Sequence, residues 1–443
     1  MMKILFIGQL TDNSGYGNAA RSYVSTLSKL HESGDIELSL LNHSFESDSS
    51  LKEEEKKLIQ KYSLVDHGDF SPQEKLSFYT EENIAKIQKY LDDNKDNFHV
   101  MSLVVPDLYK EGYKFNNLAF NWGSNGKILN KQSISMPYVM KYAAGLYPCF
   151  VWEFDSLPKA WSEGIQFVSN KIVKFISACS WNKEVIERCT NKKSIVIPYM
   201  VKPKVEPDTE YANKIKGSLK DRYTFCMVGQ LQNRKGYDIL LKSFLTEFKD
   251  DNVNLLMKCY TGEVFGVDSQ QTVDKAKNLI LSVKNLITSY GSSVNDYKCN
   301  LIVIPGLIPE EKLSSIYDVS DCFVTCTRGE GFGIPMADFL IHHKKPVISP
   351  DKGGHLDFIA PNSPLIESRF GPYFSEKSKH HATCDMNYVD PSILSARKQM
   401  RKMYEIGKNN DKYSKICDTM HKHAKEYLDP DHNVRMFRDL LGV

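Results

Sequence analysis

The sequence feature that most restricts the fold is a short apolar run followed by three closely spaced glycines and a proline. Residues 321–326 are rich in β-forming side chains and predict a buried strand. Gly329, Gly331 and Gly333 allow a tight turn in which backbone can approach a ligand closely. Pro335 fits the first turn of a helix, because its missing N–H is not needed there. A strand, a glycine turn and a helix start predict an anion site, since free N–H groups and the helix dipole converge there.

Two carboxylates flank this predicted anion site. Glu330 lies within the turn, and Asp338 lies inside the helix that follows. An acid beside an anion site does not bind phosphate, but it can accept hydrogen bonds from the hydroxyl groups of a sugar or a ribose. A phosphorylated polyhydroxyl ligand therefore fits both features. The alternative from these residues alone is an ordinary strand-to-helix turn with two solvated acids.

The segment 330–338, Glu-Gly-Phe-Gly-Ile-Pro-Met-Ala-Asp, resembles the Glu-x7-Glu signature of the family-4 retaining glycosyltransferases, which use nucleotide sugars. The usual last acid is glutamate, and here Asp338 is one methylene shorter. The resemblance implies an α/β protein of the GT-B fold, with two Rossmann-like domains facing across a cleft and a C-terminal helix returning to the first domain. It also implies that Glu330 contacts the donor sugar and Asp338 the donor's ribose. The donor-binding residues expected in this segment are Glu330, Gly331, Phe332, Gly333, Ile334 and Asp338.

Length and composition indicate the number of domains and argue against several classes of protein. A chain of 443 residues is long enough for two domains, and its net charge of +2 does not favour bulk capture of nucleic acid. No apolar run approaches the ~18 residues that span a bilayer, and the start of the chain does not read as a signal peptide. The ten cysteines are scattered without a Cys-x-x-Cys pair, so we expect reduced thiols and a cytoplasmic protein. A peripheral contact of the basic C-terminal helices with a membrane is left open.

The first half begins with a strand–loop–helix–strand pattern over residues 3–41. In the glycosyltransferase interpretation, Gly15 and Gly17 form a glycine loop after the first strand that approaches the donor phosphates and the acceptor. The string Gly15-x-Gly17-x-x-Ala20 also matches a dinucleotide-binding fingerprint, so a nicotinamide-dependent oxidoreductase is an alternative. Against it, the glycines lie several residues past the strand, and the second strand is followed by Asn42 and His43 instead of an acid.

Two later stretches point to the acceptor. Residues 109–141 are aromatic and rich in asparagine, which is typical of variable loops near a binding site. Residues 152–161 resemble a Trp-Glu-x-Asp-x-Leu-Pro-x-x-Trp segment of some family-4 enzymes. A strand predicted to end at Glu153 would bring that acid to the ligand crevice, where it could act as a base or orient the acceptor. Asp107 is a second candidate base, and an ordinary helix-start acid is the alternative for Glu153.

The second half opens with a predicted strand over residues 223–229, a turn, and a helix from residue 237. Arg234 and Lys235 lie in the turn, and adjacent cations at such a place favour neutralisation of a diphosphate; a solvated basic turn is the alternative. Lys235 matches the lysine of the family's Gly-Arg-Leu-x-x-x-Lys-Gly motif, whereas Gln230 replaces its arginine. The pair instead resembles an Arg-Lys variant of that motif. The resemblance further implies that the backbone of Leu307 and Ile308 holds the nucleotide base.

These observations together predict a glycosyltransferase of the hexosyltransferase type. We expect residues 1–205 to form an acceptor-side domain, residues 206–405 a nucleotide-sugar domain, and residues 406–443 helices packing back on the first. A sugar would pass from a UDP- or GDP-sugar to a hydroxyl of a glycan or lipid-linked acceptor, with retention of configuration. The residues expected to act in catalysis are Glu330, Lys235, Arg234 and Glu153. Since Arg234 and Lys235 supply positive charge, no metal or other cofactor is expected, and the His342-His343 and His380-His381 pairs are interpreted as surface residues.

Several points stay open at the level of sequence. A GT-B epimerase or phosphorylase, and a non-catalytic nucleotide-sugar-binding protein, share the same motifs. Asp338 and Gln230 differ from the glutamate and the arginine of the family motifs, so a non-catalytic relative stays an alternative. The residues do not specify the donor sugar, its base, the acceptor, the linkage, the catalytic base or the oligomeric state.

Overall fold

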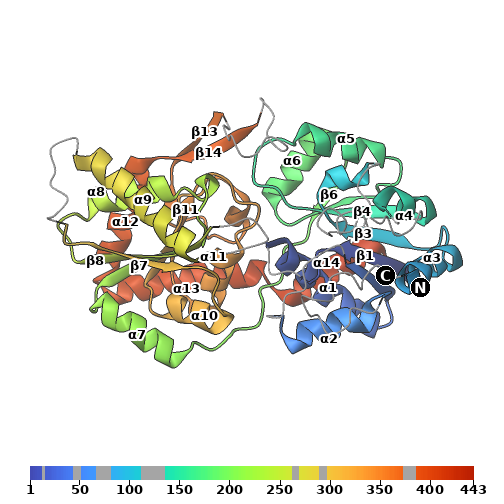
Figure 1. Cartoon of the computed structure of the whole chain (residues 1–443), viewed down its shortest axis with the longest axis horizontal. Helices are drawn as coiled ribbons and strands as arrows, with labels where there is room; N and C mark the ends of the chain where they lie inside the picture. The colour runs from blue at the N-terminus through green and yellow to red at the C-terminus, as the bar shows by residue number, and fades with distance from the viewer. Residues whose placement is uncertain are drawn as a thin grey trace, which may run out of the picture. The chain divides into compact units, whose positions relative to one another are not determined.

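The computed structural model describes residues 1–11, 15–42, 51–65, 81–110, 135–261, 269–288, 297–372 and 386–443. The chain forms two compact units, each with its own parallel sheet (Figure 1). The first unit contains Met1–Met200, Met386 and Asp429–Val443, and the second contains residues 201–372 and Asn387–Leu428. The aromatic stretch expected to form acceptor loops lies largely outside the described residues, because 111–134 are among those not described. His380 and His381 also lie outside them.

Six parallel strands form the sheet of the first unit, in the order β2-β1-β3-β4-β5-β6. Ile4 of β1 pairs with Leu38 on one side and with His99 on the other. Residues 4–7 are fully buried, as expected for a central parallel strand covered on both faces. The strands are β1 (Met2–Gly8), β2 (Ile36–Asn42), β3 (His99–Leu103), β4 (Gly145–Phe150), β5 (Phe175–Ser177) and β6 (Ser194–Val196).

Helices cover the sheet of the first unit. Leu5 and Ile7 of β1 belong to a core that Leu91 of α3 and Val139 of α4 complete. Helix α1 packs on β1 and β2. The α-helices are α1 (Gly15–Glu32), α2 (Glu53–Tyr62), α3 (Glu81–Asp93), α4 (Met136–Tyr142), α5 (Lys159–Phe167), α6 (Ser180–Thr190) and α14 (Pro430–Leu441), with a 3-10 helix at Pro106–Tyr109.

The C-terminal helix α14 returns to the first unit and packs on α1, as predicted (Figure 1). Phe437 is fully buried and meets the ring of Tyr23 edge-on, with ring centres 5.6 Å apart. The Asn433 amide donates to the carbonyl of Pro198 at 2.7 Å, and the Arg438 guanidinium donates to the Asp35 carboxylate at 2.8 Å. An apolar contact flanked by two polar ones fixes the helix along its whole length.

Helix α13 (Asn410–Tyr427), which precedes α14, lies in the second unit. The Tyr413 hydroxyl donates to the carbonyl of Asp321 at 2.6 Å, and His421 bonds the carbonyl of Leu340 at 2.9 Å. Met420 and Ala424 are buried on the same helix. Within the segment 406–443, which we expected to pack on the first domain, the chain therefore changes unit at residue 429, because the apolar stripe of α13 packs on the second unit.

The sheet of the second unit also has six parallel strands, in the order β12-β11-β10-β7-β8-β9. Phe323 of β10 pairs with Cys226 of β7 on one side and with Val347 of β11 on the other. The strands are β7 (Tyr223–Gln230), β8 (Val253–Tyr260), β9 (Asn300–Pro305), β10 (Cys322–Val324), β11 (Val347–Pro350) and β12 (Leu365–Ile366), with an antiparallel hairpin of β13 (Ser368–Pro372) and β14 (Asn387–Pro391). Two parallel sheets with interleaved helices confirm the predicted α/β class.

Helices α8 and α12 pack together over one face of this second sheet. Leu240 and Phe244 of α8 and Met400 and Met403 of α12 are fully buried in its core. In the part of the chain that the structure describes, no helix has the length and apolar character needed to cross a bilayer. The remaining α-helices are α7 (Thr209–Leu219), α8 (Tyr237–Glu247), α9 (Ser269–Thr288), α10 (Glu310–Asp318), α11 (Ile334–Asp338) and α12 (Ile393–Gly407), with 3-10 helices at Asn233–Lys235 and Gly354–Asp357 and a π-helix at Phe339–His343.

Candidate functional site

The predicted strand, glycine turn and helix are present in the second unit. Strand β10 ends at Val324, residues 325–333 form a loop that we call the glycine loop, and α11 begins at Ile334. Gly333 adopts a left-handed φ of 99°, and a Cβ there would approach the Cε of Met336 to 2.6 Å. Pro335 lies in the first turn of α11, where no N–H is needed. Glycine is thus favoured at residue 333 by its left-handed backbone, while the end of the flexible Met336 side chain would have to move for a larger residue.

A second turn lies against the glycine loop. Residues 233–236, which we call the cation turn, connect β7 to α8 and carry Arg234 and Lys235. Gly236 has a left-handed φ of 66°, and a Cβ there would lie 1.8 Å from the carbonyl oxygen of Cys326. Because β7 and β10 are neighbouring parallel strands, their carboxyl ends lie at the same edge of the sheet. The topology therefore places the cation turn directly on the glycine loop.

Three of the predicted site residues are in contact across these two turns. The Lys235 ammonium donates to the Glu330 carboxylate at 2.6 Å, and both side chains are largely buried, with 17% and 14% exposed. The Arg234 guanidinium donates to the carbonyl of Gly329 at 2.8 Å. Burial alone would raise the pKa of Glu330, but the charges of Lys235 and Arg234 outweigh it and hold that pKa below its ordinary value. Glu330 is therefore ionised at neutral pH and balances a buried positive charge.

A glycine pair, Gly353 and Gly354, follows β11 and lies against the same loop. The N–H of Gly354 donates to the carbonyl of Glu330 at 2.8 Å. His355 is fully buried, and its Nε2 donates to the carbonyl of Pro350 at 2.9 Å. Its Nδ1 has no hydrogen-bonding partner among the described residues, and burial lowers the pKa of the ring. The sequence reasoning missed His355; its signal was its position directly after a glycine pair at a strand end.

The other predicted donor-binding residues are spread along the same edge of the second unit. Asp338 ends α11 and is half-buried; its charge adds to burial in raising the pKa of Tyr317 on α10. Phe332 is buried and its ring lies 5.4 Å from that of Phe358. Leu307 is 61% exposed and, with the half-buried Ile308, follows β9 in a turn. These residues thus come from the end of α11, from the glycine loop and from the turn after β9.

In the first unit, Gly15 and Gly17 lie in the first turn of α1 and not in a loop. The prediction of a loop at these two positions was therefore wrong, because the helix begins at Gly15, although glycine is a poor helix former. Gly15 is exposed with open space around it, and Gly17 is buried. Residues 12–14, which complete the connection to β1, lie outside the described residues.

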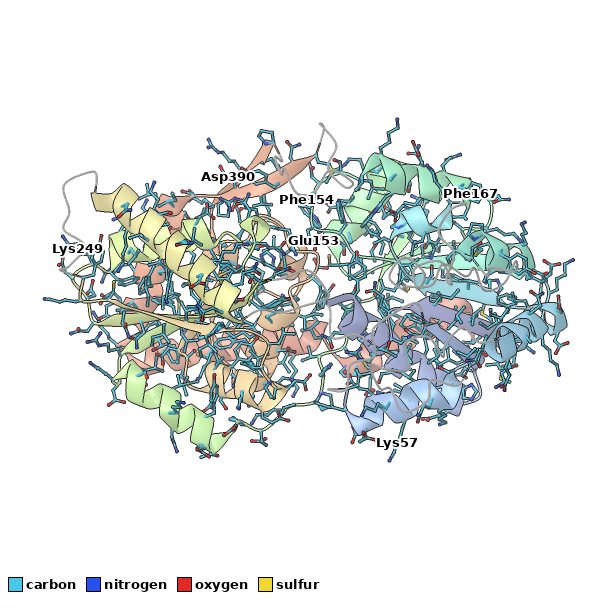
Figure 2. The ribbon with its side chains drawn as sticks, viewed as in Figure 1. Lys57, Glu153, Phe154, Phe167, Lys249 and Asp390 are labelled. Atoms are coloured by element: carbon cyan, nitrogen blue, oxygen red, sulfur yellow. The ribbon has the colours of Figure 1, made fainter. Side chains whose placement is uncertain are left out.

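Glu153 is half-buried on the loop after β4, next to Phe154 (Figure 2). The strand ends at Phe150, three residues earlier than predicted, because Trp152 turns away to pack on Trp161 with ring centres 4.2 Å apart. The indole N–H of Trp152 donates to the carbonyl of Ser156 at 2.8 Å and closes this turn. Glu153 is therefore held by a loop packed through aromatic side chains, and not by the sheet itself.

Tyr199, which the sequence reasoning did not select, connects the two predicted regions of the first unit. Burial strongly raises the pKa of its phenol, and nearby Tyr16 and Glu153 add to that rise. The start of α1 and the loop after β4 are therefore close to one buried hydroxyl. Asp107, the other candidate base, lies in the 3-10 helix after β3, and its Oδ1 has no hydrogen-bonding partner among the described residues.

No protein-family model matches the chain, and a search of curated proteins found no match. Solved structures do resemble it over their full length. Sucrose-phosphate synthase from Thermosynechococcus elongatus is 12% identical, with all of both chains covered and a TM-score of 0.61. HepE from Anabaena, solved in complex with UDP and glucose, is 10% identical, with all of both chains covered and a TM-score of 0.57. An α,α-trehalose-phosphate synthase (UDP-forming) from Burkholderia vietnamiensis is 9% identical, with 100% of this chain and 99% of that chain covered and a TM-score of 0.59.

The chain has the GT-B fold. At such low identity the likeness shows the fold and no finer property.

Proposed function

We propose that this protein is a retaining glycosyltransferase that moves a hexose from a UDP- or GDP-sugar to a hydroxyl group of a glycan or lipid-linked acceptor. One observation carries the proposal: Arg234, Lys235 and Glu330 meet where the carboxyl ends of β7 and β10 lie side by side. Open α/β sheets bind their ligands at that edge. Two cations beside a buried carboxylate match a donor that is anionic at one end and rich in hydroxyl groups at the other.

The leaving group of such a reaction is a nucleoside diphosphate, whose negative charge grows as the glycosidic bond breaks. Lys235 and Arg234, together with backbone N–H groups of residues 332–334, would stabilise that charge most strongly in the transition state. A lysine ammonium has three donors, so Lys235 can bridge the Glu330 carboxylate and a phosphate oxygen at the same time. Glu330, kept ionised by these cations, would accept hydrogen bonds from the donor sugar.

The remaining roles follow from position. We assign the donor's ribose to Asp338 and its base to the backbone of Leu307 and Ile308. The start of α1, at Gly15 and Gly17, would approach the donor phosphates and the acceptor. Glu153 would orient or deprotonate the acceptor hydroxyl. The nearby Tyr199 is a further candidate for contact with the acceptor.

Because Lys235 and Arg234 supply the positive charge, we propose a reaction that needs no divalent metal and no cofactor besides its donor. Activity measured in excess EDTA should equal activity measured with added Mg²⁺ or Mn²⁺. Strict dependence on an added divalent ion would overturn this part of the mechanism.

The test of the proposal is nucleotide binding followed by product analysis. UDP or GDP should raise the melting temperature in a concentration-dependent way, since a ligand at 100 times its Kd stabilises the folded state by about 2.7 kcal/mol. UMP and GMP are the matched controls and should bind more weakly, because they lack the phosphate that the cation turn would neutralise. Absence of any shift with either diphosphate would refute a nucleotide-sugar site.

Product analysis separates the remaining reaction types. Incubation with labelled UDP- or GDP-sugar and an acceptor should give a glycoside whose anomeric configuration matches that of the donor, as read by NMR. An epimerised donor, release of sugar phosphate, or binding with neither hydrolysis nor transfer would each point to another GT-B activity. A titration with NADH should show no binding, and saturable binding would favour the oxidoreductase alternative.

A further inference from the structure

Arg328 lies two residues before Glu330 and is the one cationic residue of the glycine loop. Arg328 is only 9% exposed, although a guanidinium is costly to bury. The two Nη atoms donate to the two carboxylate oxygens of Asp238 at 2.8 and 2.7 Å. Nη1 also donates to Asn233, to its carbonyl at 2.7 Å and to its side-chain oxygen at 3.0 Å. Both Nη atoms of Arg328 are therefore bonded to residues of the second unit, whereas its buried Nε has no hydrogen-bonding partner among the described residues.

The partners of Arg328 stand on either side of the two proposed phosphate-binding cations. Asn233 begins the cation turn, and Asp238 lies in the first turn of α8, just after it. The guanidinium thus joins both ends of the turn that carries Arg234 and Lys235. The backbone reinforces the same arrangement, because the N–H of Arg328 donates to the carbonyl of Arg234 at 2.6 Å.

The backbone and the side chain of Arg328 also contact the β13–β14 hairpin. The N–H of Val389 donates to the carbonyl of Arg328 at 2.8 Å, and the guanidinium lies 5.8 Å from the ring centre of Tyr388. Burial alone would raise the pKa of Asp238, but hydrogen bonding and charge from Arg328 lower it below its ordinary value. Asp238 is thus ionised at neutral pH, and the pair keeps its two parallel, charge-assisted hydrogen bonds.

Stability alone is a weak reason for such a pair. The Asp238 side chain is 43% exposed, and an ion pair with an exposed partner contributes little to stability, whereas a guanidinium–carboxylate pair fixes geometry in two directions. The geometry fixed here is the position of the cation turn relative to Glu330, 95 residues away in the chain. A shift of about 1 Å in a charged group can cost about 100-fold in rate, even when it arises at a residue away from the chemistry.

We propose that Arg328 and Asp238 are positioning residues, which hold Lys235 and Arg234 at the distance from Glu330 that leaving-group stabilisation requires. The inference rests on the proposed function, since it assigns the pair a part in that reaction without contact with the donor. Ground-state binding of the donor uses many groups, whereas charge stabilisation in the transition state depends on the exact place of the cations. Loss of the pair should therefore lower kcat far more than it raises the KM for the donor.

The experiment compares Asp238→Asn, Arg328→Met and Arg328→Lys with wild type. The readouts are release of nucleoside diphosphate from a panel of UDP- and GDP-sugars, affinity for UDP and GDP, and melting temperature. We expect kcat to fall about 10- to 100-fold in Asp238→Asn and Arg328→Met, with the donor KM changed less than about 3-fold. Arg328→Lys keeps the charge without the planar fork and should recover only part of kcat.

Arg401→Met is the matched control. Arg401 is an arginine of the same unit that also joins two acids, donating to Glu247 at 2.8 Å and to Asp251 at 2.7 Å, but it belongs to α12 and not to either turn. It should lose stability without losing kcat. Were Arg328→Met to misfold, the nearly isosteric Asp238→Asn would decide the question.

The outcomes separate the inference from the proposed function. Wild-type kcat in folded Asp238→Asn and Arg328→Met, or a kcat loss of the same size in Arg401→Met, would overturn the inference alone. Failure of wild type to bind UDP and GDP or to release either from any donor would overturn the proposed function, and the inference with it. A kcat loss confined to the Arg328 and Asp238 variants, with nucleotide affinity kept, would support both.

Discussion

The two units share one architecture but hold their strand ends together in different ways. In the second unit, charged and backbone groups join the cation turn to the glycine loop, as in the contacts of Lys235 with Glu330 and of Arg328 with Asp238. In the first unit, Arg21 also pairs with Glu55, at 2.9 Å, but the loop that carries Glu153 is packed by aromatic side chains, with Trp152 on Trp161. Charge therefore holds the predicted donor site of the second unit, and aromatic packing holds the loop of Glu153 in the first. The difference indicates that the strand ends, and not the fold, set the chemistry.

The largest expected effect tests the charged end of the second unit. Glu330→Ala and Lys235→Ala should each lower sugar transfer by at least about 10²–10³-fold, because each removes a group aimed at charge or hydroxyls in the transition state. The double variant should lose little more than either single one, since the two residues act together. Transfer rates and circular dichroism would check this. Turnover near that of wild type in either folded variant would contradict the assignment.

The next effect compares one glycine from each unit. Gly236→Ala should destabilise the protein by about 3 kcal/mol, because a Cβ would overlap the carbonyl of Cys326 and the left-handed backbone disfavours alanine. It should also lower activity, since the cation turn must move. Gly15→Ala is the control: it lies in open space at the start of α1 and should change stability by no more than about 0.5 kcal/mol. Urea denaturation measures both, and equal stabilities would show that the close contact is absent.

Lys258 and Lys235 are two lysines of the second unit with different surroundings. Lys235 pairs with the carboxylate of Glu330, whereas Lys258 pairs with no carboxylate among the described residues. Lys258 lies on β8, is 5% exposed, and contacts the ring of Tyr260 at 5.1 Å. Burial lowers its pKa from 10.5 to about 8. The folded state therefore disfavours the ammonium, and this cost is fully present below pH 8 and disappears as the pH rises toward 10.5.

Lys258→Met should consequently stabilise the protein at pH 7 by about 1–3 kcal/mol. The advantage over wild type should shrink between pH 8 and pH 10.5. Melting temperatures of the two proteins across that range would test the sign. A variant that is less stable than wild type at pH 7 would show that the ammonium has a partner that compensates its burial.

The smallest expected effect tests the aromatic end of the first unit. Glu153→Gln should lower transfer to the acceptor by about 10-fold, because the amide cannot take up the proton of the acceptor hydroxyl. UDP or GDP affinity and donor hydrolysis should stay within about 3-fold of wild type. A matching loss in nucleotide affinity would show that the two units do not divide donor and acceptor in this way.

Local signals were sufficient for much of the fold. The strand before the glycine loop, the proline-started helix and the strand–turn–helix at residues 223–247 were predicted because each depends on neighbours in the chain. The end of β4 was misplaced by three residues because Trp152 packs on a residue that periodicity does not reveal. The start of α1 at Gly15 was missed because two glycines so close together favour a turn over a helix.

The sequence by itself determined which residue types carry the chemistry: two adjacent cations in one turn, a carboxylate in a glycine loop, and strands and helices in alternation. Only the tertiary structure decided that these turns touch, because their contact depends on β7 and β10 being neighbours in the sheet. The same strand order buries Arg328 against Asp238, 90 residues apart, and leaves His355 without a partner for Nδ1 among the described residues. Hydrophobic periodicity records which face of an element is buried, but not which other element covers it, and that choice set the geometry of the site.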